Sequence, residues 1–537
     1  MQSFKNEYTY RHFVEEGRGE EFDSLFDRAV SRAKHEVMGK RFPMYINGEE
    51  AYAANELEEH SPIDGFLIGR FQKGGRDDAR LAIASALEAF KSWKKTGYME
   101  RVRIFKKAAL LFSENKFLLA AILSIENGKT RYESVGEVDE AIDFMNYYSE
   151  DMQRKRGYLR RSRLEGSRAK VSAGFQGAPG SGEKITIAMK PYGVFGVIAP
   201  FNFPISISTG MSAAALITGN TVVFKPSSTD NMSMLTGLYI YKLLWESGLP
   251  KGVFNYITGP GSELGDELVS NSGIGGIAFT GSRSTGKSML RKTYGAASPK
   301  AFVVEMGGKN PAIVSQHADL EKAVSGISSA AFGFSGQKCS ACSRVYVHES
   351  IKDVFISGLV EKAKGLRLGD PLVKGNYMGP LISSRAVARY NESSAEAARS
   401  GRILYGGKTV EINGGVYAEP TIAEVSHSNR LFSEELFLPF LVVDTYKDFD
   451  EAIEKANDTG YGLTAGLYSG SRKEIKAFLD RIEAGVVYVN REISATTGAI
   501  VGLHAFVGWK GSGLTGKGTG SMFYLQQFMR EQSLSLS

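Results

Sequence analysis

Cys339 is the residue of this sequence best suited to act as a nucleophile. It stands in the segment GQKCSAC, directly after Lys338 and in polar surroundings, whereas an inert structural cysteine usually lies among apolar residues. A neighbouring cation, or a helix N-terminus, lowers the pKa of a thiol and raises the fraction of reactive thiolate. We therefore expect Cys339 to form covalent intermediates, with a buried inert thiol as the alternative from these residues alone.

Three other residues follow predicted strands or short polar turns and could assist this nucleophile. Asn202, in APFNFP, offers an amide that can donate to an oxyanion. Glu305, in VVEMGG, stands among apolar residues, where desolvation raises the pKa of a carboxyl group toward that of a general base. Glu435, in FSEELF, could bind the two hydroxyls of a ribose. The alternatives are a turn-capping Asn, a salt-bridged Glu and a solvated acidic pair.

Two glycine-rich turns could bind phosphate groups. The first, GSRSTGKS at residues 281–288, matches the P-loop pattern GxxxxGK[ST], so a P-loop nucleotide-binding protein is a competing prediction. The second, at residues 259–265, misses the GxGxxG spacing by one residue. Both turns precede predicted helices, whose N-termini bind anions through backbone N–H groups. Glycines that merely permit tight turns are the alternative, and no persuasive metal-binding Asp ends a later strand.

The segments between these motifs predict the elements that position them. From residue 185 to about 304, the strands GVFGVIAP, TVVFKP, VFNYITG, GIAFTG and AFVVEMGG alternate with helices that begin near residues 211, 232, 262 and 285. A second alternating block runs from about residue 312 to 490. Alternation of this kind predicts an α/β fold, with parallel sheets covered by helices on both faces.

The rest of the chain predicts elements around these two blocks. Residues 1–43 are helical and charged in pattern, and Asn47 and Gly48 indicate a hairpin turn. Residues 77–150 carry apolar side chains at helical spacing. The basic, Gly-rich stretch that follows predicts a linker or a projecting hairpin, and the chain ends in a short amphipathic segment, MFYLQQFMREQSLSLS.

Composition narrows the class of protein. A length of 537 residues predicts two or three domains. The net charge of +6 comes from dispersed basic residues, so we expect neither a nucleic-acid partner nor, because no apolar run reaches membrane-spanning length, a membrane partner. Two cysteines and an N-terminus without the apolar core of a signal peptide favour the cytoplasm. We expect no metal site.

Taken together, PFNFP, KPSS, FTGSRSTG, VEMGGKNP, GQKC and EELF resemble the motifs of the aldehyde dehydrogenase superfamily, in the same order and over nearly the whole chain. The resemblance implies a Rossmann-type cofactor domain, an α/β catalytic domain and a small β oligomerisation element, in a dimer or a multiple of dimers. The implied limits are residues 1–154 and 185–304 for the cofactor domain, 155–184 for a bridging hairpin, 305–492 for the catalytic domain and 493–537 for an anchor loop and tail.

The resemblance also assigns roles to residues. Cys339 attacks the aldehyde, the Asn202 amide and the Cys339 N–H bind the oxyanion, and Glu305 activates the water that hydrolyses the thioester. The cofactor is NAD or NADP. Many NAD-preferring relatives carry a Glu, which repels a 2′-phosphate, where this chain has Ser228, so NADP is plausible, whereas the habit of the most similar branch slightly favours NAD. The expected cofactor-binding residues are Lys225, Ser228, Gly281, Ser282, Gly286, Glu435 and Phe437, and the P-loop match becomes a coincidence.

Within the superfamily, FKNEY, DEAIDFMNYYS, GQKCSACSRVYVHES and NREISATTGAIVG are most similar to the 1-pyrroline-5-carboxylate dehydrogenase branch. That branch oxidises L-glutamate γ-semialdehyde to L-glutamate in proline catabolism, which implies a small aldehyde substrate that carries a carboxylate. By resemblance, Ser340, Gly498 and Ala499 bind the carboxylate, and Phe203 and Phe506 hold the aliphatic chain.

Three departures leave another semialdehyde or a small aldehyde as the alternative substrate. The segment AFVGWKGSG lacks a Pro and a Gly that are usual in the superfamily, Leu438 replaces a usual Gly, and ISATTGA is lengthened relative to the branch. Cys342 has two interpretations, a partner of Cys339 in a reversible disulfide or a small buried residue, of which the second is favoured.

Overall fold

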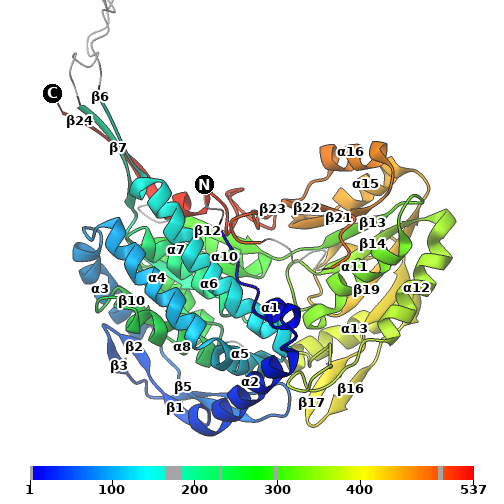
Figure 1. Ribbon diagram of the computed structural model, residues 1–537, viewed down its shortest axis with the longest axis horizontal. Helices are drawn as coiled ribbons and strands as arrows, with labels where there is room; N and C mark the ends of the chain where they lie inside the picture. Colours follow the sequence, from blue (N-terminus) through cyan, green and yellow to red (C-terminus); the bar gives the residue numbers. More distant parts are fainter. Residues whose placement is uncertain (1–3, 164–183, 229–232, 295–298, 494–499, 537) are drawn as a thin grey trace, which may run out of the picture.

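The computed structural model describes residues 4–163, 184–228, 233–294, 299–493 and 500–536. Figure 1 shows two lobes, each built around a mixed sheet, and a narrow third sheet that projects away from them. In the described residues both large sheets have seven strands. The two blocks of alternating strands and helices predicted from the sequence correspond to these two lobes.

The first sheet has the strand order β12-β11-β8-β9-β10-β2-β3. The strands from β12 to β10 are parallel, while β2 and β3 join antiparallel at one edge. Asn47 and Gly48 form the predicted turn between β2 and β3, with φ of 57° and 75°. The strands are β2 (Met44–Ile46), β3 (Glu49–Ala51), β8 (Val194–Ile198), β9 (Thr221–Lys225), β10 (Phe254–Tyr256), β11 (Ile274–Gly281) and β12 (Ala301–Met306).

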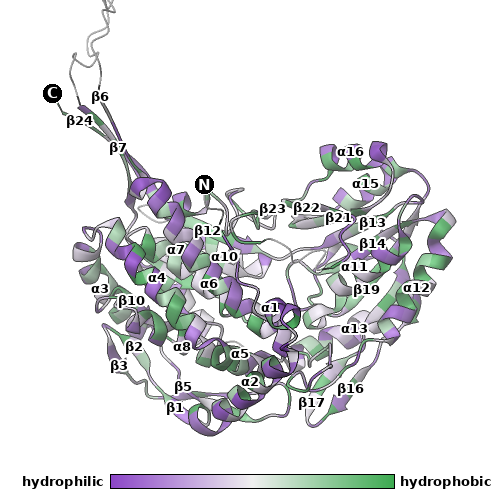
Figure 2. Ribbon diagram, viewed as in Figure 1, coloured by the Kyte–Doolittle hydropathy of each residue, from purple (hydrophilic) through white to green (hydrophobic). Residues whose placement is uncertain are grey.

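Helices cover both faces of the first sheet, because successive strand residues point to opposite sides. Val223 packs against α3 (Arg76–Trp93), α9 (Asp266–Ser270) and α10 (Arg283–Thr293). Its neighbours Val222 and Phe224 face the thicker layer of α4 (Tyr98–Glu114), α5 (Lys116–Asn127), α6 (Arg131–Arg154), α7 (Ser206–Ile217) and α8 (Met234–Glu246). Figure 2 shows both colours on outer helices such as α3 and α4, as expected of amphipathic helices.

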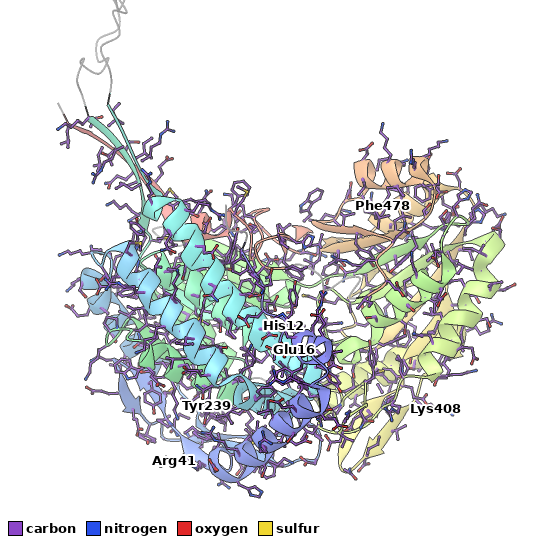
Figure 3. All side chains as sticks on the ribbon, viewed as in Figure 1. His12, Glu16, Arg41, Tyr239, Lys408 and Phe478 are labelled. Carbon is purple, nitrogen blue, oxygen red and sulfur yellow. The ribbon has the colours of Figure 1, made fainter. Side chains whose placement is uncertain are left out.

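The second sheet has the order β15-β18-β19-β14-β13-β21-β22, in which only β15 is antiparallel to its neighbour. On one face lie α11 (Leu320–Phe332) and α12 (Lys352–Lys364). On the other lie α13 (Ser384–Ser400), α14 (Arg430–Ser433), α15 (Phe449–Asn457) and α16 (Arg472–Arg481). Phe478 of α16, labelled in Figure 3, is fully buried. The strands are β13 (Asn310–Val314), β14 (Cys342–His348), β15 (Gly401–Tyr405), β18 (Thr421–Val425), β19 (Phe440–Tyr446), β21 (Thr464–Tyr468) and β22 (Val486–Val489).

The projecting sheet joins the basic stretch to the C-terminal tail. Its order is β24-β7-β6, with β6 (Leu159–Arg163), β7 (Lys184–Pro191) and β24 (Met529–Leu536), and both pairings are antiparallel. The amphipathic tail segment is a short 3-10 turn (Tyr524–Phe528), in which Tyr524 and Phe528 are buried, followed by β24. The hairpin interpretation of the basic stretch is therefore confirmed for its described part.

The predicted N-terminal helices are α1 (Thr9–Glu15), α2 (Gly19–Arg32) and a π-turn (Ala33–Val37), and α2 packs against α5. A small sheet follows, made of β1 (Lys40–Phe42), β5 (Leu67–Gln72) and β4 (Glu56–His60). Two hairpins complete the chain, β16 (Thr409–Ile412) with β17 (Gly415–Ala418) and β20 (Tyr461–Gly462) with β23 (Trp509–Lys510). Among the described residues no single helix is long and apolar enough to cross a membrane; α4 and α5 meet that test only together, bent by 70°.

Candidate active site

Parallel pairing brings four of the predicted site residues to one edge of the first sheet. Lys225 lies beside Ile198, four residues before Asn202, and Glu305 lies beside Thr280, which precedes the phosphate turn. Because parallel strands end at the same edge, the loops that follow them meet there. The C-terminal segment closes this edge, since the Met306 N–H donates to the Ser512 carbonyl at 2.7 Å.

A cavity of about 800 Å³ opens at this edge, between the two lobes. Residues of both lobes line it, and they include most of the side chains singled out from the sequence. Those that line the cavity are Asn202, Lys225, Gly281, Ser282, Glu305, Cys339, Glu435, Phe437 and Phe506. Within the described ranges, no group of three or more His, Cys, Asp or Glu side chains is arranged to hold a metal ion.

Cys339 is half-buried in a turn just before β14, and its loop is held in an unusual conformation. Phe334 and Ser335 both have φ of 50°, in the left-handed region that non-glycine residues rarely adopt. Gly336 follows with φ of 66°, and its backbone lies so close to the Leu438 carbonyl that a side chain would collide with it. The turn that presents the thiol is therefore fixed by its contact with the segment after Phe437.

The expected activation of Cys339 by Lys338 was wrong for this state of the protein. Burial raises the pKa of the Cys339 thiol to about 12, and the nearby carboxylates Glu435 and Glu305 raise it further. Lys338 is itself buried, and Glu133 and Lys129 are the charges that affect its pKa most. No helix begins at Cys339 either. The thiol is therefore protonated at neutral pH, because desolvation outweighs the field of Lys338.

Glu305 has the environment expected of a general base. Burial raises the pKa of its carboxyl group well above the usual value, opposed only by a backbone N–H of Gly508. Its second oxygen, Oε2, is buried and has no hydrogen-bond partner among the described residues. A carboxylate oxygen of this kind can accept a proton from a water or a thiol in the cavity.

Asn202 is buried, with 3% of its surface exposed, in the turn between β8 and α7. Its side chain lines the same cavity as Cys339 and Glu305. The main chain of the turn is tied to the α5–α6 loop, since Asn127 Nδ2 donates to the Phe201 carbonyl at 3.3 Å and Lys129 Nζ donates to the Asn202 carbonyl at 2.5 Å. The amide is thus rigidly supported, as an oxyanion donor must be.

The turn at residues 281–288 faces the cavity in a way that does not suit a P-loop. Ser282 caps α10 by accepting the Thr285 N–H at 3.2 Å, and Ser288 also lines the cavity. Lys287, which would have to reach the phosphates of a P-loop nucleotide, is exposed and lies outside the cavity lining. Gly286 is also outside it, and a side chain there would collide with Met306. The close packing of α10 against Met306 therefore requires a glycine at this position.

Lys225 and Glu435 belong to different lobes, and both line the cavity. Lys225 Nζ donates to Ser228 Oγ at 3.1 Å, and burial lowers its pKa to about 8. Ser228 in turn donates to the Gly259 carbonyl, in the loop after β10, and Ser227 lines the cavity in its place. Glu435 accepts the Gly308 N–H at 2.7 Å, and burial raises its pKa to about 7.

Of the residues expected to bind the substrate, the structure describes Ser340, Phe203 and Phe506. Phe506 lines the cavity, whereas Ser340 and Phe203 lie behind its wall. Ser340 is buried beside Cys339, and the Phe203 ring packs against Phe334 with the centroids 6.3 Å apart.

The other two, Gly498 and Ala499, lie outside the described residues. Phe201, two residues before Phe203, lines the cavity and contacts Phe437 edge-on at 5.8 Å. Among the described residues, the aromatic residues that line the cavity are therefore Phe201, Phe279, Phe437 and Phe506.

Sequence reasoning missed a set of cavity residues that come from distant segments. Arg385 and Arg389 stand one turn apart on α13, and Arg389 donates to the Leu436 carbonyl at 3.1 Å. Gly261 and Ser262, from the weaker glycine motif, also line the cavity. The glycine motif did indicate that Gly261 and Ser262 could face a ligand. In contrast, no sequence motif near Arg385 indicates that this residue faces a ligand. Its place depends on how the second lobe packs against the first.

Cys342 begins β14 and is buried in the hydrophobic cluster between β14 and α11. Both cysteines are free thiols. The favoured interpretation of Cys342 as a small buried residue therefore agrees with its surroundings. Leu438, the unusual residue of EELFLP, is buried in the cluster on the other face of the same sheet.

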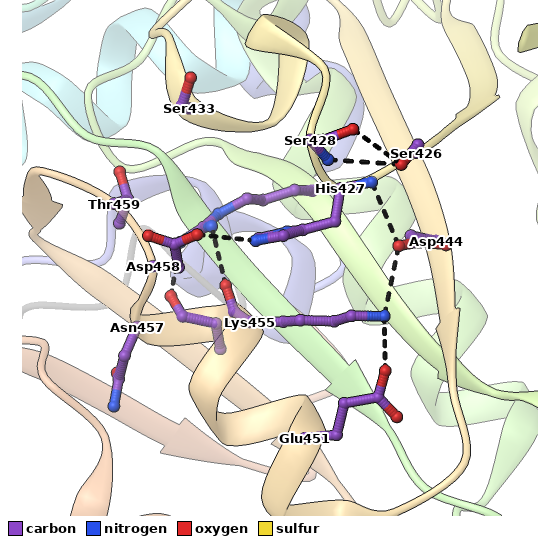
Figure 4. Close-up of polar contacts among 12 residues, drawn as sticks. Ser426, His427, Ser428, Ser433, Asp444, Glu451, Lys455, Asn457, Asp458 and Thr459 are labelled. Atoms are coloured by element: carbon purple, nitrogen blue, oxygen red, sulfur yellow. Dashed lines mark hydrogen bonds and ion pairs between the residues drawn. The ribbon is translucent and has the colours of Figure 1, made fainter.

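A buried arginine ties the loop after Glu305 to the second lobe. Arg344 Nε donates to the Lys309 carbonyl at 2.8 Å, and its Nη2 donates to the Ala456 carbonyl at 2.6 Å, at the end of α15. The polar contacts around that helix end are drawn in Figure 4, where Lys455 pairs with Asp444 and Glu451. The network is remote from the cavity and fixes the backbone from which Lys309 and its neighbours project.

Comparisons with known proteins agree with this geometry. A model of the Aldehyde dehydrogenase family matches residues 49–534. A protein of Geobacillus sp. called 1-pyrroline-5-carboxylate dehydrogenase is 36% identical over 544 residues, covering 100% of this chain and 99% of its own. The solved 1-pyrroline-5-carboxylate dehydrogenase from Thermus with bound NAD superposes with a TM-score of 0.90 at 33% identity, covering 100% and 99%. Lactaldehyde dehydrogenase from Escherichia coli gives a TM-score of 0.84 at 31% identity, covering 93% and 99%.

Proposed function

Because this chain belongs to the aldehyde dehydrogenase family, we propose that it oxidises L-glutamate γ-semialdehyde, the open form of 1-pyrroline-5-carboxylate, to L-glutamate. One observation carries the reaction type: a single cavity is lined by a thiol, a desolvated carboxyl group and a buried amide, Cys339, Glu305 and Asn202. The substrate is supported by the likeness to 1-pyrroline-5-carboxylate dehydrogenases, which extends over the whole chain, including the residues before the family match.

The chemistry begins with the Cys339 thiol, which must lose a proton before it can attack. Glu305, whose pKa burial raises well above its usual value, is the base in the cavity that can accept it. The thiolate then adds to the aldehyde carbon and forms a thiohemiacetal. The negative charge on its oxygen is stabilised by the Asn202 amide and the Cys339 N–H. Loss of hydride to the cofactor leaves a thioester on Cys339.

Hydrolysis of the thioester needs a second activated nucleophile. Glu305 first releases the thiol proton to solvent and then removes a proton from a water molecule. The resulting hydroxide attacks the thioester carbon, and the Cys339 thiolate leaves as the carboxylic acid forms. The same oxyanion donors act in this step, since the geometry of the attacked carbon is again tetrahedral. Aldehyde, water and oxidised cofactor are thus converted to carboxylate, reduced cofactor and two protons.

The donor set of the cavity fits a nicotinamide dinucleotide, which when bound supplies the hydride acceptor. Ser282 and the N-terminus of α10 offer backbone N–H groups to a pyrophosphate. Lys225 and Glu435 suit the hydroxyls of the two riboses, and Phe437 packs near the nicotinamide. NAD is the proposed cofactor. Ser228 carries no charge that would repel a 2′-phosphate, so the proposal includes slower use of NADP.

Recognition of the substrate is proposed to use residues on both sides of Cys339. Ser340 and the main chain of Gly498 and Ala499 bind the α-carboxylate, and Phe506 packs on the aliphatic chain. Phe203 supports this site from behind, through its contact with Phe334. An α-amino acid aldehyde carries two charges that need such partners, because burying an unpaired charge is costly.

The wider assignments are also proposals. Residues 1–154 and 185–304 form the cofactor domain, 305–492 the catalytic domain, and 155–184 with the tail of 493–537 pair with another subunit in a homo-oligomer. The free thiols of Cys339 and Cys342 support a reducing compartment such as the cytoplasm.

The test is a panel of aldehydes read at the absorbance of the reduced nicotinamide, with wild-type protein and Cys339→Ala. We expect the highest kcat/KM for glutamate γ-semialdehyde and no turnover by the variant. A second candidate, an enzyme for another small aldehyde such as lactaldehyde, is favoured by the likeness to lactaldehyde dehydrogenase. A higher kcat/KM for an aldehyde without a carboxylate would replace the proposed substrate with that one.

A further inference from the structure

Behind the wall of the cavity, a fully buried ion pair joins Lys129 to Glu137. Neither side chain is exposed, and neither lines the cavity. Lys129 lies in the short loop between α5 and α6, and Glu137 lies in the second turn of α6. An ion pair removed from water contributes little net stability, because the desolvation of both charges opposes their attraction. The contacts of this pair indicate another purpose.

The two residues of this ion pair form hydrogen bonds with both ends of the turn that carries Asn202. Lys129 Nζ donates to the Asn202 carbonyl at 2.5 Å. Glu137 Oε1 accepts the Ile205 N–H at 2.7 Å and the Ser206 N–H at 3.2 Å, at the start of α7. Since Lys129 and Glu137 are also bound to each other, the two ends of the turn are held at a fixed separation. The backbone that carries the Asn202 side chain therefore has little freedom to move.

The same ammonium group reaches the loop that leads to the nucleophile. Lys129 Nζ lies 3.5 Å from the centre of the Phe203 ring and 4.6 Å from that of Phe334. Phe334 has the left-handed backbone of the loop before Cys339, and it belongs to the second lobe. A buried cation over two aromatic faces is held firmly by their electrostatic attraction. Lys129 thus contacts both the segment with the oxyanion amide and the segment with the thiol.

We propose that Lys129 and Glu137 are positioning residues that fix the Asn202 amide relative to Cys339. Neither residue touches the reacting atoms. The ion pair sets the distance between an amide on the first lobe and a thiol on the second, which must stay constant through both tetrahedral states. This proposal rests on the aldehyde dehydrogenase reaction described above, but on no particular aldehyde.

The chain contains a matched control on the same helix. Lys116 and Asp139 form an ion pair at 2.7 Å, with side chains 8% and 7% exposed. Asp139 lies two residues after Glu137 on α6, and Lys116 also donates to Thr9 Oγ1 at 2.5 Å. This second pair braces the N-terminal helix and contacts no residue of the cavity lining that the structure describes. Loss of this pair removes the same kind of interaction from the same helix.

The experiment compares K129M/E137Q with K116M/D139N. Both double variants remove both charges of their pair, so neither partner is left as an unpaired ion. Each also takes a cation from one further acid, Glu140 beside Lys129 and Glu7 beside Lys116. We expect K129M/E137Q to lower kcat about 10- to 100-fold, the effect of displacing or losing an oxyanion donor, with the KM for NAD changed less than about 2-fold. We expect K116M/D139N to keep kcat within about 2-fold of wild type, although its Tm falls. Equal losses of kcat in the two double variants would contradict the proposal.

A double-mutant cycle that combines K129M/E137Q with Asn202→Ala separates an effect through Asn202 from a general loss of structure. If Lys129 and Glu137 act through Asn202, K129M/E137Q lowers kcat by less than about 2-fold once the amide is gone. A loss of full size in the N202A background would overturn the proposal. If K129M/E137Q does not fold, Glu137→Asp replaces it in the cycle. This variant keeps both charges but shortens the side chain that binds the start of α7. An unchanged kcat in E137D would then count against the proposal.

The outcome is independent of the proposed substrate. Wild-type protein is assayed first with glutamate γ-semialdehyde and with the aldehyde panel, and the cycle is measured with whichever aldehyde it oxidises fastest. Failure of the semialdehyde overturns the substrate assignment and leaves the cycle intact. Additive losses in the cycle overturn the role of Lys129 and Glu137 and leave the substrate assignment intact.

Discussion

The side-chain amide of Asn310 donates a hydrogen bond to the main-chain carbonyl of Cys339, at 2.8 Å. The same nitrogen donates to the Ala341 carbonyl at 2.8 Å, and Oδ1 accepts the Thr464 N–H at 3.0 Å. Asn310 is buried at the first position of β13. Asn310 therefore connects the loop after Glu305 with the turn that carries Cys339. The position of the thiol relative to the second sheet depends on these hydrogen bonds.

Replacing Asn310 by alanine should impair catalysis as well as folding. Three buried hydrogen bonds are lost, so we expect about 2–4 kcal/mol lower stability and a kcat about 10-fold lower, because the Cys339 backbone is released. Asn255 is a matched control, since it is fully buried and holds Asn47 and Gly252 away from the cavity. Urea unfolding measures the stability of N310A and N255A, and initial rates measure their kcat. A similar fall in kcat for N255A would mean that stability alone explains the effect.

Cys339→Ala should abolish aldehyde oxidation, with a loss of at least ~10⁴-fold in kcat, since no other group in the described cavity can form the thioester. Binding of NAD should persist, because the cofactor-facing residues are untouched. Turnover and NAD-dependent fluorescence are the two measurements. Residual activity above a hundredth of wild type would show that another residue is the nucleophile.

The reactivity of Cys339 in the free enzyme should rise steeply with pH. Its pKa is raised to about 12 by burial, so the thiolate fraction, and with it the rate of alkylation by iodoacetamide, increases about tenfold per pH unit between about pH 7 and pH 9. Cys339→Ala reports the background from Cys342. Lys338→Met should change the rate less than about twofold, because desolvation is the main cause of the raised thiol pKa. A plateau in rate below about pH 8 would indicate an activated thiol and contradict this expectation.

Binding of the cofactor should weaken as the pH rises through about 8. Burial lowers the pKa of Lys225 to about 8, so its ammonium group loses its charge above that pH and becomes a poorer donor to a ribose or phosphate oxygen. We expect the KM for NADP to rise more than that for NAD, since only NADP carries the 2′-phosphate. Lys225→Met should raise both KM values at neutral pH and remove their pH dependence. Parallel pH profiles in wild type and variant would exclude Lys225 as the cause.

The buried carboxyl pair Glu59 and Glu126 should make the protein less stable at high pH. Both accept backbone N–H groups at the start of α8, Glu59 from Ser233 at 2.8 Å and Glu126 from Leu235 at 2.8 Å. Burial raises the pKa of Glu59 to about 7 and that of Glu126 well above its usual value. The folded state therefore binds more protons than the unfolded chain. This contribution is complete below about pH 4.5 and is lost as the pH rises through about 7.

Glu126→Gln removes one of the two acids but keeps an acceptor for the helix. We expect its Tm to fall less than that of wild type between about pH 5.5 and pH 8.5, since one pKa unit corresponds to about 1.4 kcal/mol. Differential scanning fluorimetry at these two values is sufficient. If Tm falls by the same number of degrees in E126Q and wild type, Glu126 is not a source of the pH dependence.

Much of the chemistry could be read from short segments of the sequence. Glu305 was placed among apolar residues, and its raised pKa follows from that placement. The alternation of strands and helices predicted both lobes, because parallel strands buried on two faces must be short, apolar and separated by helices. Asn202, Lys225 and Glu305 stand at strand ends, and parallel pairing alone is enough to bring them to one edge.

Other features could not be read in this way, since they arise from contacts between distant segments. The sequence puts Lys338 next to Cys339, yet burial rather than this neighbouring cation dominates the thiol pKa. Ser228 was expected to face the cofactor, but its hydroxyl bonds to the Gly259 carbonyl.

By itself, the sequence determined which groups could act as nucleophile, base and oxyanion donor, because those abilities belong to side chains and to their immediate neighbours. Only the tertiary structure decided the pKa of the Cys339 thiol and which loop carbonyl Lys129 binds. It also decided that Arg385 lines the cavity. Burial and direction are properties of the packed lobes, and desolvation and hydrogen bonding depend on both.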